Sequence, residues 1–278
     1  MLGTLVEMLS YSFMQRALLA GLFVAILAPL VGSFLVYRRM AFIGDTLAHV
    51  AFAGVAIGVY VRDGLGWGGV SPFLSALVVS ALAALVIQFL ADRTDAYNDV
   101  SMAIVLSGGF ALGTVVISLT GGIAVSINQY IFGSISTVSW HHVRIMAALT
   151  ALVGGVVAVS YKHLLYITFD ESAARVARLD VDLQNSLLVV LTALVIVAAM
   201  QIMGVILVAA MLVVPVAAAG QIAPSFKASV LLSIVVAELS VFSGVTLSYT
   251  NDVAASGAIV LIAIGLYAAA TVADRYVV

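Results

Sequence analysis

The sequence predicts an all-α, polytopic helical membrane protein, and its composition carries that prediction. The 278 residues are 64% hydrophobic and 9% charged, with a mean hydropathy of +1.25. Soluble domains average about 45–50% apolar and about 25% charged residues, so this chain lacks the charge that keeps a soluble surface dispersed. A spanning helix needs about 20 apolar residues, which leaves room for about eight to nine transmembrane helices. The apolar stretches are continuous instead of alternating, which argues against a membrane β-barrel.

Charged residues interrupt the apolar runs and so mark the ends of the spans. The runs predict helices at residues 14–36, 42–61, 71–91, 100–119, 141–160, 184–202, 204–220, 228–248 and 255–273. A division at Gly204 separates nine spans from eight, because residues 184–220 could form one long bent helix. Residues 1–13 predict a short interfacial helix. No segment is long and polar enough for a soluble domain, so we expect a single transmembrane domain over residues 1–278.

The orientation follows from the excess of Lys and Arg in cytoplasmic loops. If Arg38 and Arg39 are cytoplasmic, the basic residues divide unevenly between the two sides. The inner group is Arg38, Arg39, Arg93, Lys162, Arg175, Arg178, Lys227 and Arg275, and the outer group is Arg16, Arg62 and Arg144. The C-terminus is then cytoplasmic, and with nine spans the N-terminus lies outside.

Several kinds of chemistry are excluded by what the sequence lacks. Without cysteine there are no disulfides and no thiolate metal sites. The sequence contains no G-x-x-x-x-G-K-[ST] phosphate loop, no H-E-x-x-H and no G-x-S-x-G. No basic patch is long enough to bind nucleic acid. We therefore expect no enzymatic activity in this chain, and any active transport must draw on an ion gradient or a separate ATPase.

Three ionisable residues fall inside predicted spans: Asp45, His49 and Glu238. A charged group near the bilayer centre costs at least about 2.5–3.5 kcal/mol, so such residues usually face a cavity and serve a function. Asp45 and His49 are four residues apart and therefore lie on one helix face. Two carboxylates and one imidazole at similar depth suit a divalent transition cation such as Mn²⁺, Fe²⁺ or Zn²⁺.

Other interpretations of these residues stay open. Asp45 could pair with Arg38 or Arg39 near the interface, and His49 could donate a hydrogen bond to a neighbouring helix. Glu238 could be neutral and structural. His141 and His142 stand at an outer helix end, where we expect solvation. An ion-coupled secondary cation transporter is the alternative function, although the inverted repeats common in that class are not evident.

The longest polar stretch on the cytoplasmic side covers residues 162–183. Within it, the segment from Asp170 to Arg178 predicts a short helix with an acidic first turn and Asp170 as its N-cap. On the outer side, residues 128–139 are half polar and too short to span, which suits a re-entrant or surface helix.

The segment Tyr37–His49 reads Y-R-R-M-A-F-I-G-D-T-L-A-H. It resembles the R-R-M-x-x-x-G-D-[AT]-L-[AS]-H signature of the zinc- and manganese-type ABC transporter permeases, the ABC-3 family of metal transporters. Gln129–Ser134, Thr168–Glu171 and Val205–Val216 resemble further segments of that family, in the same order. The resemblance covers nearly the whole chain.

The resemblance implies the membrane-spanning subunit of an ATP-driven importer of Mn²⁺ or Zn²⁺ that works by alternating access in the cytoplasmic membrane of a prokaryote. The implied fold is similar to a reduced vitamin-B12-importer permease. The implied partners are a second copy of the chain, two ATP-binding-cassette ATPase subunits and an extracytoplasmic metal-binding protein. No cofactor is held permanently, since the metal is cargo and ATP with Mg²⁺ binds in the partner subunit.

The resemblance also assigns residue roles. The G-D-x-L-x-H motif assigns the metal path to Asp45 and His49, whereas Glu238 rests on its predicted burial alone. A coupling helix that docks on the ATPase is implied for Asp170, Glu171, Ala173, Ala174, Arg175, Ala177 and Arg178. The family has a glycine shortly after the Ala-Arg pair, where this chain has Arg178.

Overall fold

The computed structural model describes residues 7–93, 98–119, 133 and 137–277, and this part of the chain is helical without β-strands. Within it, nine helices are long and apolar enough to cross a membrane. They are α2 (Ser12–Tyr37), α3 (Phe42–Val59, continued by the π-helical η1, Tyr60–Gly64), α4 (Pro72–Arg93), α5 (Asn98–Leu119), α7 (Trp140–Phe169), α9 (Val181–Met203), α10 (Val205–Ile222), α11 (Phe226–Asn251) and α12 (Ala255–Val277). The short helix α8 (Glu171–Val176) lies between α7 and α9.

Nine spans, and not eight, form because the chain breaks at Gly204. Its φ of 82° and ψ of 162° belong to a backbone region that is essentially restricted to glycine. The α9 helix therefore ends at Met203, and α10 begins at Val205. The single residue between them separates two spanning helices.

The end of α7 differs from the sequence prediction, and parts of two other predicted segments lie outside the described residues. The α7 helix runs to Phe169 instead of ending near residue 160, because buried Leu164 and Ile167 continue its apolar face. The cytoplasmic loop expected from residue 162 thus begins at Asp170. Residues 7–10 form a helical turn ahead of α2, and residues 1–6 of the predicted interfacial helix are not described. Most of the segment 128–139 also lies outside the described residues.

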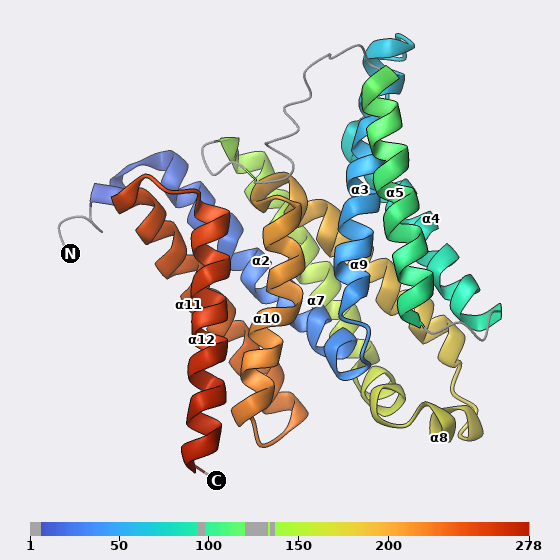
Figure 1. Ribbon diagram of the computed structural model, residues 1–278, viewed down its shortest axis with the longest axis vertical. Helices are drawn as coiled ribbons and strands as arrows, with labels where there is room; N and C mark the ends of the chain where they lie inside the picture. The colour runs from blue at the N-terminus through green and yellow to red at the C-terminus, as the bar shows by residue number, and fades with distance from the viewer. Residues whose placement is uncertain (1–6, 94–97, 120–132, 134–136, 278) are drawn as a thin grey trace.

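The α9 helix connects two groups of helices (Figure 1). On one side α3 packs against α4 and α5, and on the other α10, α11 and α12 pack together with α2. The α9 helix contacts α3 and α4 of the first group and α2 and α10 of the second. In Figure 1, α8 and the C-terminus lie at the same end of the molecule. We call this end cytoplasmic, because it carries the larger group of basic residues.

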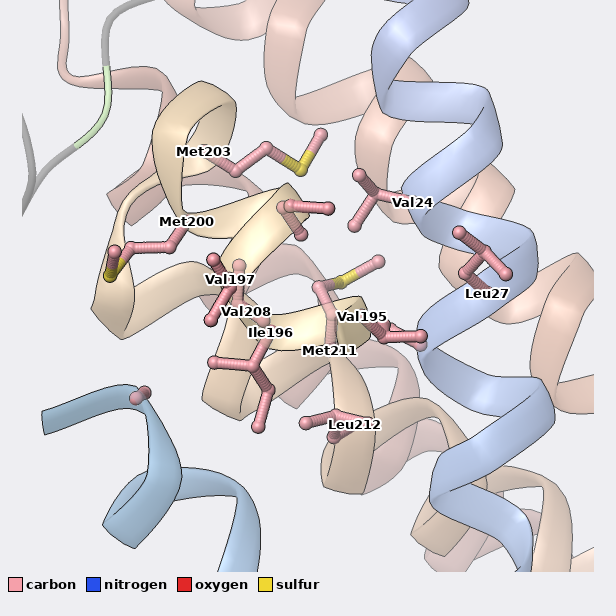
Figure 2. Close-up of a cluster of buried hydrophobic side chains, with 14 of the residues drawn as sticks. Val24, Leu27, Val195, Ile196, Val197, Met200, Met203, Val208, Met211 and Leu212 are labelled. Carbon is pink, nitrogen blue, oxygen red and sulfur yellow. The ribbon is translucent and has the colours of Figure 1, made fainter. Parts of the chain in front are cut away.

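The core is formed where α2, α9 and α10 meet (Figure 2). Val24 and Leu27 of α2, Ile196 and Met200 of α9 and Met211 of α10 belong to this cluster, and all five are fully buried. Lipid tails are as apolar as these side chains, so van der Waals packing, more than removal from water, holds the helices together.

Five aromatic rings join α2, α7 and α11 at the cytoplasmic end. The Phe226 ring lies 5.1 Å from Phe34, 5.2 Å from Tyr37, 5.8 Å from Phe169 and 6.3 Å from Tyr161 between centroids. Tilted and edge-on aromatic pairs at such distances contribute about 0.5–1.5 kcal/mol each. Phe169 is the last residue of α7, so this aromatic cluster fixes the point from which α8 begins.

Replacing Gly204 tests the break between α9 and α10. We expect Gly204→Ala to destabilise the folded chain by about 1–3 kcal/mol, because alanine is strained in this backbone region. The measurement is thermal unfolding of the detergent-solubilised protein. Gly265→Ala is the matched control, since Gly265 lies within α12 and an added Cβ meets nothing within 4 Å. Equal melting temperatures for the two variants would contradict the assignment.

Candidate functional site

Asp45 and His49 form a side-by-side pair on the surface of α3. The Oδ1 atom of Asp45 lies 3.6 Å from Nε2 of His49, and the side chains are 45% and 33% exposed in the single chain. Asp45 stands in the first turn of α3, where the helix dipole favours a carboxylate. The carboxylate and the imidazole thus lie on the same face of the helix and close together.

The position of α3 depends on close contact with α5. At Gly109 an added Cβ would lie 2.6 Å from a methyl group of Val50, so only glycine allows this approach. The next residue of α5, Phe110, places its ring edge-on to the His49 imidazole, with centroids 5.8 Å apart. This contact orients the ring of His49 and leaves its Nε2 atom on the side of Asp45.

The other interpretation of Asp45 is a pair with Arg38 or Arg39, but among the described residues neither arginine forms an ion pair with it. Arg38 instead donates a hydrogen bond to Oδ1 of Asn185 at 2.5 Å and lies 3.8 Å from Oε2 of Glu171. The nearby polar partner of Asp45 is His49. The carboxylate is therefore available to a ligand.

Glu238 is on α11, which packs against α2, α10 and α12. Its side chain is half-buried at the edge of the packed face. Among the described residues, no three or more His, Cys, Asp or Glu side chains come close enough together to hold a metal ion. One chain therefore presents Asp45 and His49 as a pair, with Glu238 on a separate helix.

The outer histidines serve the start of α7. Nδ1 of His142 accepts a hydrogen bond from the backbone N–H of Ser139 at 3.2 Å, and the Ser139 hydroxyl accepts one from the His142 N–H at 3.4 Å. This reciprocal pair is a capping box, which satisfies backbone donors at the helix start. His141 is exposed beside it.

The predicted coupling helix is α8, and Asp170 is its N-cap. Oδ1 of Asp170 accepts a hydrogen bond from the backbone N–H of Ala173 at 2.8 Å. Ala174 is fully buried in a small cluster with Ile167 and Val181, so it anchors α8 to α7 and α9 and does not face outward. The predicted set omitted Val176, whose side chain is 85% exposed. An apolar residue in a charged cytoplasmic loop is the signal that could have identified it.

Arg178 explains how α8 ends where the resemblance implies glycine. Its φ is +60°, in the left-handed region that glycine usually occupies. The N–H of Arg178 bonds to the carbonyl of Arg175, and the N–H of Leu179 bonds to that of Ala174. This is a Schellman motif built on arginine, at a cost of about 1–2 kcal/mol for a left-handed L-residue.

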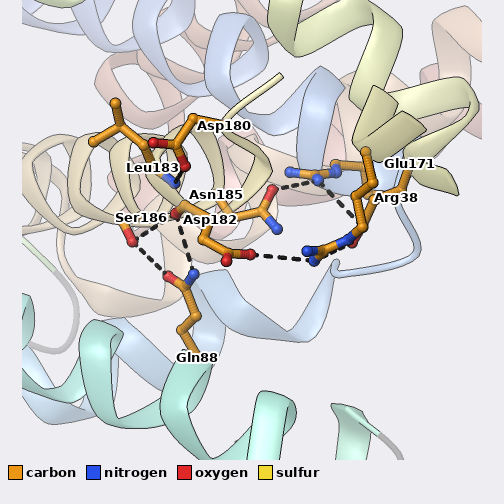
Figure 3. A network of polar contacts seen from close by, with 9 residues as sticks. Arg38, Gln88, Glu171, Asp180, Asp182, Leu183, Asn185 and Ser186 are labelled. Carbon is orange, nitrogen blue, oxygen red and sulfur yellow. Dashed lines mark hydrogen bonds and ion pairs between the residues drawn. The ribbon is translucent and has the colours of Figure 1, made fainter. Parts of the chain in front are cut away.

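A polar network joins α8 to the ends of α2, α4 and α9 (Figure 3). Arg175 donates to Oε1 of Glu171 at 2.9 Å and to Oδ1 of Asp182 at 3.1 Å. Ser186 donates to Oε1 of Gln88 on α4 at 3.0 Å. Burial lowers the pKa of Arg38 below its usual value, an effect that the nearby Glu171 carboxylate opposes. Spacing along the sequence could not reveal this network, since it joins four separate elements.

Comparison with known proteins agrees with the fold and the motifs. The model of the ABC 3 transport family matches residues 10–274. The manganese transport system membrane protein MntC of Halalkalibacterium halodurans is 31% identical over 264 residues, 95% of this chain and 88% of the relative. The high-affinity zinc uptake system membrane protein ZnuB of Haemophilus influenzae is 27% identical over 251 residues, 90% of this chain and 94% of the relative.

A solved structure shows the same architecture. PsaBC from Streptococcus pneumoniae in complex with Fab superimposes with a TM-score of 0.84 at 30% identity, covering 96% of this chain and 94% of that chain. Of the family-like segments, Tyr37–His49, Thr168–Glu171 and Val205–Val216 are described, whereas of Gln129–Ser134 only Gly133 is. Family match, fold and relatives together show that the chain belongs to the ABC 3 transport family, as a multi-pass permease of the cytoplasmic membrane.

Proposed function

We propose that this chain is the translocation subunit of an ATP-driven importer that moves Mn²⁺ or Zn²⁺ into the cell by alternating access. The observation that carries the proposal is the Asp45–His49 pair, 3.6 Å apart on the surface of a spanning helix. A carboxylate oxygen and an imidazole nitrogen are ligands that both metals accept. We assign to this pair the transient binding of the metal during passage.

The exposure of the pair supports a homodimer with the path at its axis. An ionised side chain facing the bilayer centre costs at least about 2.5–3.5 kcal/mol, so a second copy or a water-filled path must cover this face. Phe110, beside His49, is 51% exposed on the same side. Two facing copies would supply two carboxylates and two imidazoles, and each chain alone supplies too few ligands to retain the metal. Loose binding suits a conduit.

The remaining partners are assigned to the two ends of the chain. At the cytoplasmic end, α8 exposes Val176 and the Arg175 side chain, which form the proposed contact with an ATP-binding-cassette ATPase subunit. An extracytoplasmic metal-binding protein would deliver the metal to the other end. The relatives named for manganese and zinc transport support the choice of these two metals as test substrates.

Removing either ligand tests the proposed metal site. We expect Asp45→Asn and His49→Ala each to abolish ATP-dependent accumulation of Mn²⁺ and Zn²⁺ in vesicles that contain the complete complex. Each variant loses one of the two contacts that a chain makes with the bound cation, and a contact with a charged group contributes about 1.5–3 kcal/mol. The control is His163→Ala, which removes an exposed imidazole from the cytoplasmic end of α7. Undiminished uptake by both site variants would refute the assignment.

Val176 tests the docking of the ATPase. We expect Val176→Asp to leave the melting temperature unchanged and to reduce the amount of ATPase subunit that co-purifies with the chain by at least about tenfold, since interface anchors contribute about 2 kcal/mol or more. Val253→Asp, the same substitution at a 46% exposed valine on the outer side, should retain the ATPase. Ala174→Asp should instead lower the melting temperature. Full ATPase recovery with Val176→Asp would place the contact elsewhere.

Glu238 has a test of its own, because it lies away from the pair. In the proposed function it lines the path on α11, so Glu238→Gln should slow metal uptake at least about tenfold, as expected for a lost charged contact. ATP hydrolysis by the complex and the melting temperature should stay at the wild-type level. Uptake at the wild-type rate would assign Glu238 to helix packing.

A further inference from the structure

Arg38 holds an unusual position between the metal path and α8. It is the first residue after α2, and its side chain is 8% exposed. Its Nη2 atom donates to Oδ1 of Asn185 on α9 and lies 3.8 Å from Oε2 of Glu171, the first residue of α8. One buried guanidinium thus contacts both elements that flank the α8–α9 loop (Figure 3).

Glu171 contacts two arginines, of which one is buried and the other is exposed. Its Oε2 atom faces buried Arg38, and its Oε1 atom accepts a hydrogen bond from Arg175 at 2.9 Å. The Arg175 side chain is 51% exposed and also bonds Asp182. A partner that displaces α8 or engages Arg175 therefore changes the surroundings of Glu171, and through it those of Arg38.

The turn that follows Arg38 leads directly into α3. The N–H of Arg39 bonds to the carbonyl of Val36 at 3.0 Å, and the N–H of Met40 bonds to that of Leu35 at 2.8 Å. Arg39 has a φ of +59°, so this connection is a second Schellman motif with arginine in the left-handed position. The turn is short and hydrogen-bonded, and Asp45 stands in the first turn of the helix that it leads into.

A cavity lies beside Arg38 at the cytoplasmic end. It has a volume of about 320 Å³ and is lined by Arg38, Met40 and Ile43 of the α2–α3 turn and α3, and by Thr168, Glu171 and Asn185. The cavity lies between the start of α3 and the start of α8. Arg38 lines this cavity together with its two partners, Glu171 and Asn185.

We propose that Arg38 is a positioning residue that transmits displacement of α8 to the Asp45-bearing end of α3. This inference rests on the proposed function, since it assigns a route by which the ATPase would reorganise the metal path. Without the Arg38 contacts, α8 would keep its anchor on α7 and α9 through Ala174 but would lose its direct link to the turn that leads into α3. Hydrolysis would then continue without transport.

The test is the number of Mn²⁺ ions accumulated per ATP hydrolysed by the full complex in lipid vesicles supplied with the extracytoplasmic metal-binding protein. For Arg38→Gln we expect this ratio to fall at least about tenfold, the order contributed by a charged hydrogen bond. ATP hydrolysis and equilibrium Mn²⁺ binding by the solubilised complex should stay within about twofold of wild type, since Arg38 contacts neither ATP nor the Asp45–His49 pair. Arg38→Lys, which keeps the charge, should recover part of the ratio.

Arg39→Gln is the matched control, because it removes the same charge one residue later from an exposed side chain. Its ratio should equal that of wild type. Glu171→Gln, at a half-exposed position, removes the other side of the contact and should lower the ratio as Arg38→Gln does. If the complex with Arg38→Gln fails to assemble, the ratio measured for Glu171→Gln tests the role of Arg38 instead.

The outcomes separate the inference from the function on which it rests. A wild-type ratio in Arg38→Gln, or in Glu171→Gln with intact assembly, overturns the role of Arg38 while metal import by the wild type stands. Absence of ATP-dependent Mn²⁺ and Zn²⁺ accumulation in the wild-type complex overturns the proposed function itself. A loss of Mn²⁺ binding equal to the loss of transport would make Arg38 part of the metal site and also overturn its positioning role.

Discussion

The cost of placing charge in hydrocarbon governs where the ionisable residues of this chain lie. Most of them stand at the helix ends, and those at the cytoplasmic end form the network of Arg38, Glu171, Arg175 and Asp182. Asp45, His49 and Glu238 are exceptions, and the first two keep polar atoms exposed on the face of a spanning helix. In a bilayer that exposure is stable only if a polar path or a second copy covers it, so the same constraint that defines the fold also marks the proposed site.

Two kinds of interaction hold the cytoplasmic end together. The aromatic cluster around Phe226 fixes the ends of α2 and α7 to the start of α11, and the polar network fixes α8 to α2 and α9. Aromatic contacts pack an apolar interface, whereas the ion pair of Arg38 with Glu171 borders a cavity. The short helix α8 is therefore attached to the bundle by polar contacts and by buried Ala174, beside a part of the bundle that aromatic packing holds together.

Much of the fold could be predicted because each span is a local property. Twenty apolar residues between charged ones suffice to indicate a helix, and all nine expected spans are found. The N-cap of α8 by Asp170 was equally local. The end of α7 was misplaced, because Lys162 and His163 resemble a loop while Leu164 and Ile167 pack inward. Ala174 is buried and Val176 is exposed because only Ala174 meets the surface that α7 and α9 present to α8, and that surface lies outside their own segment.

The sequence determined the class of the molecule, its spans and the pairing of Asp45 with His49, since all of these depend on composition or on helical periodicity. It also contained the family-like motif that surrounds the pair. Only the tertiary structure decided that Glu238 stays apart from that pair, that Arg38 turns toward Glu171 and Asn185, and that a cavity lies behind them. These features join residues distant along the chain, and helix packing alone determines which side chains meet across such distances.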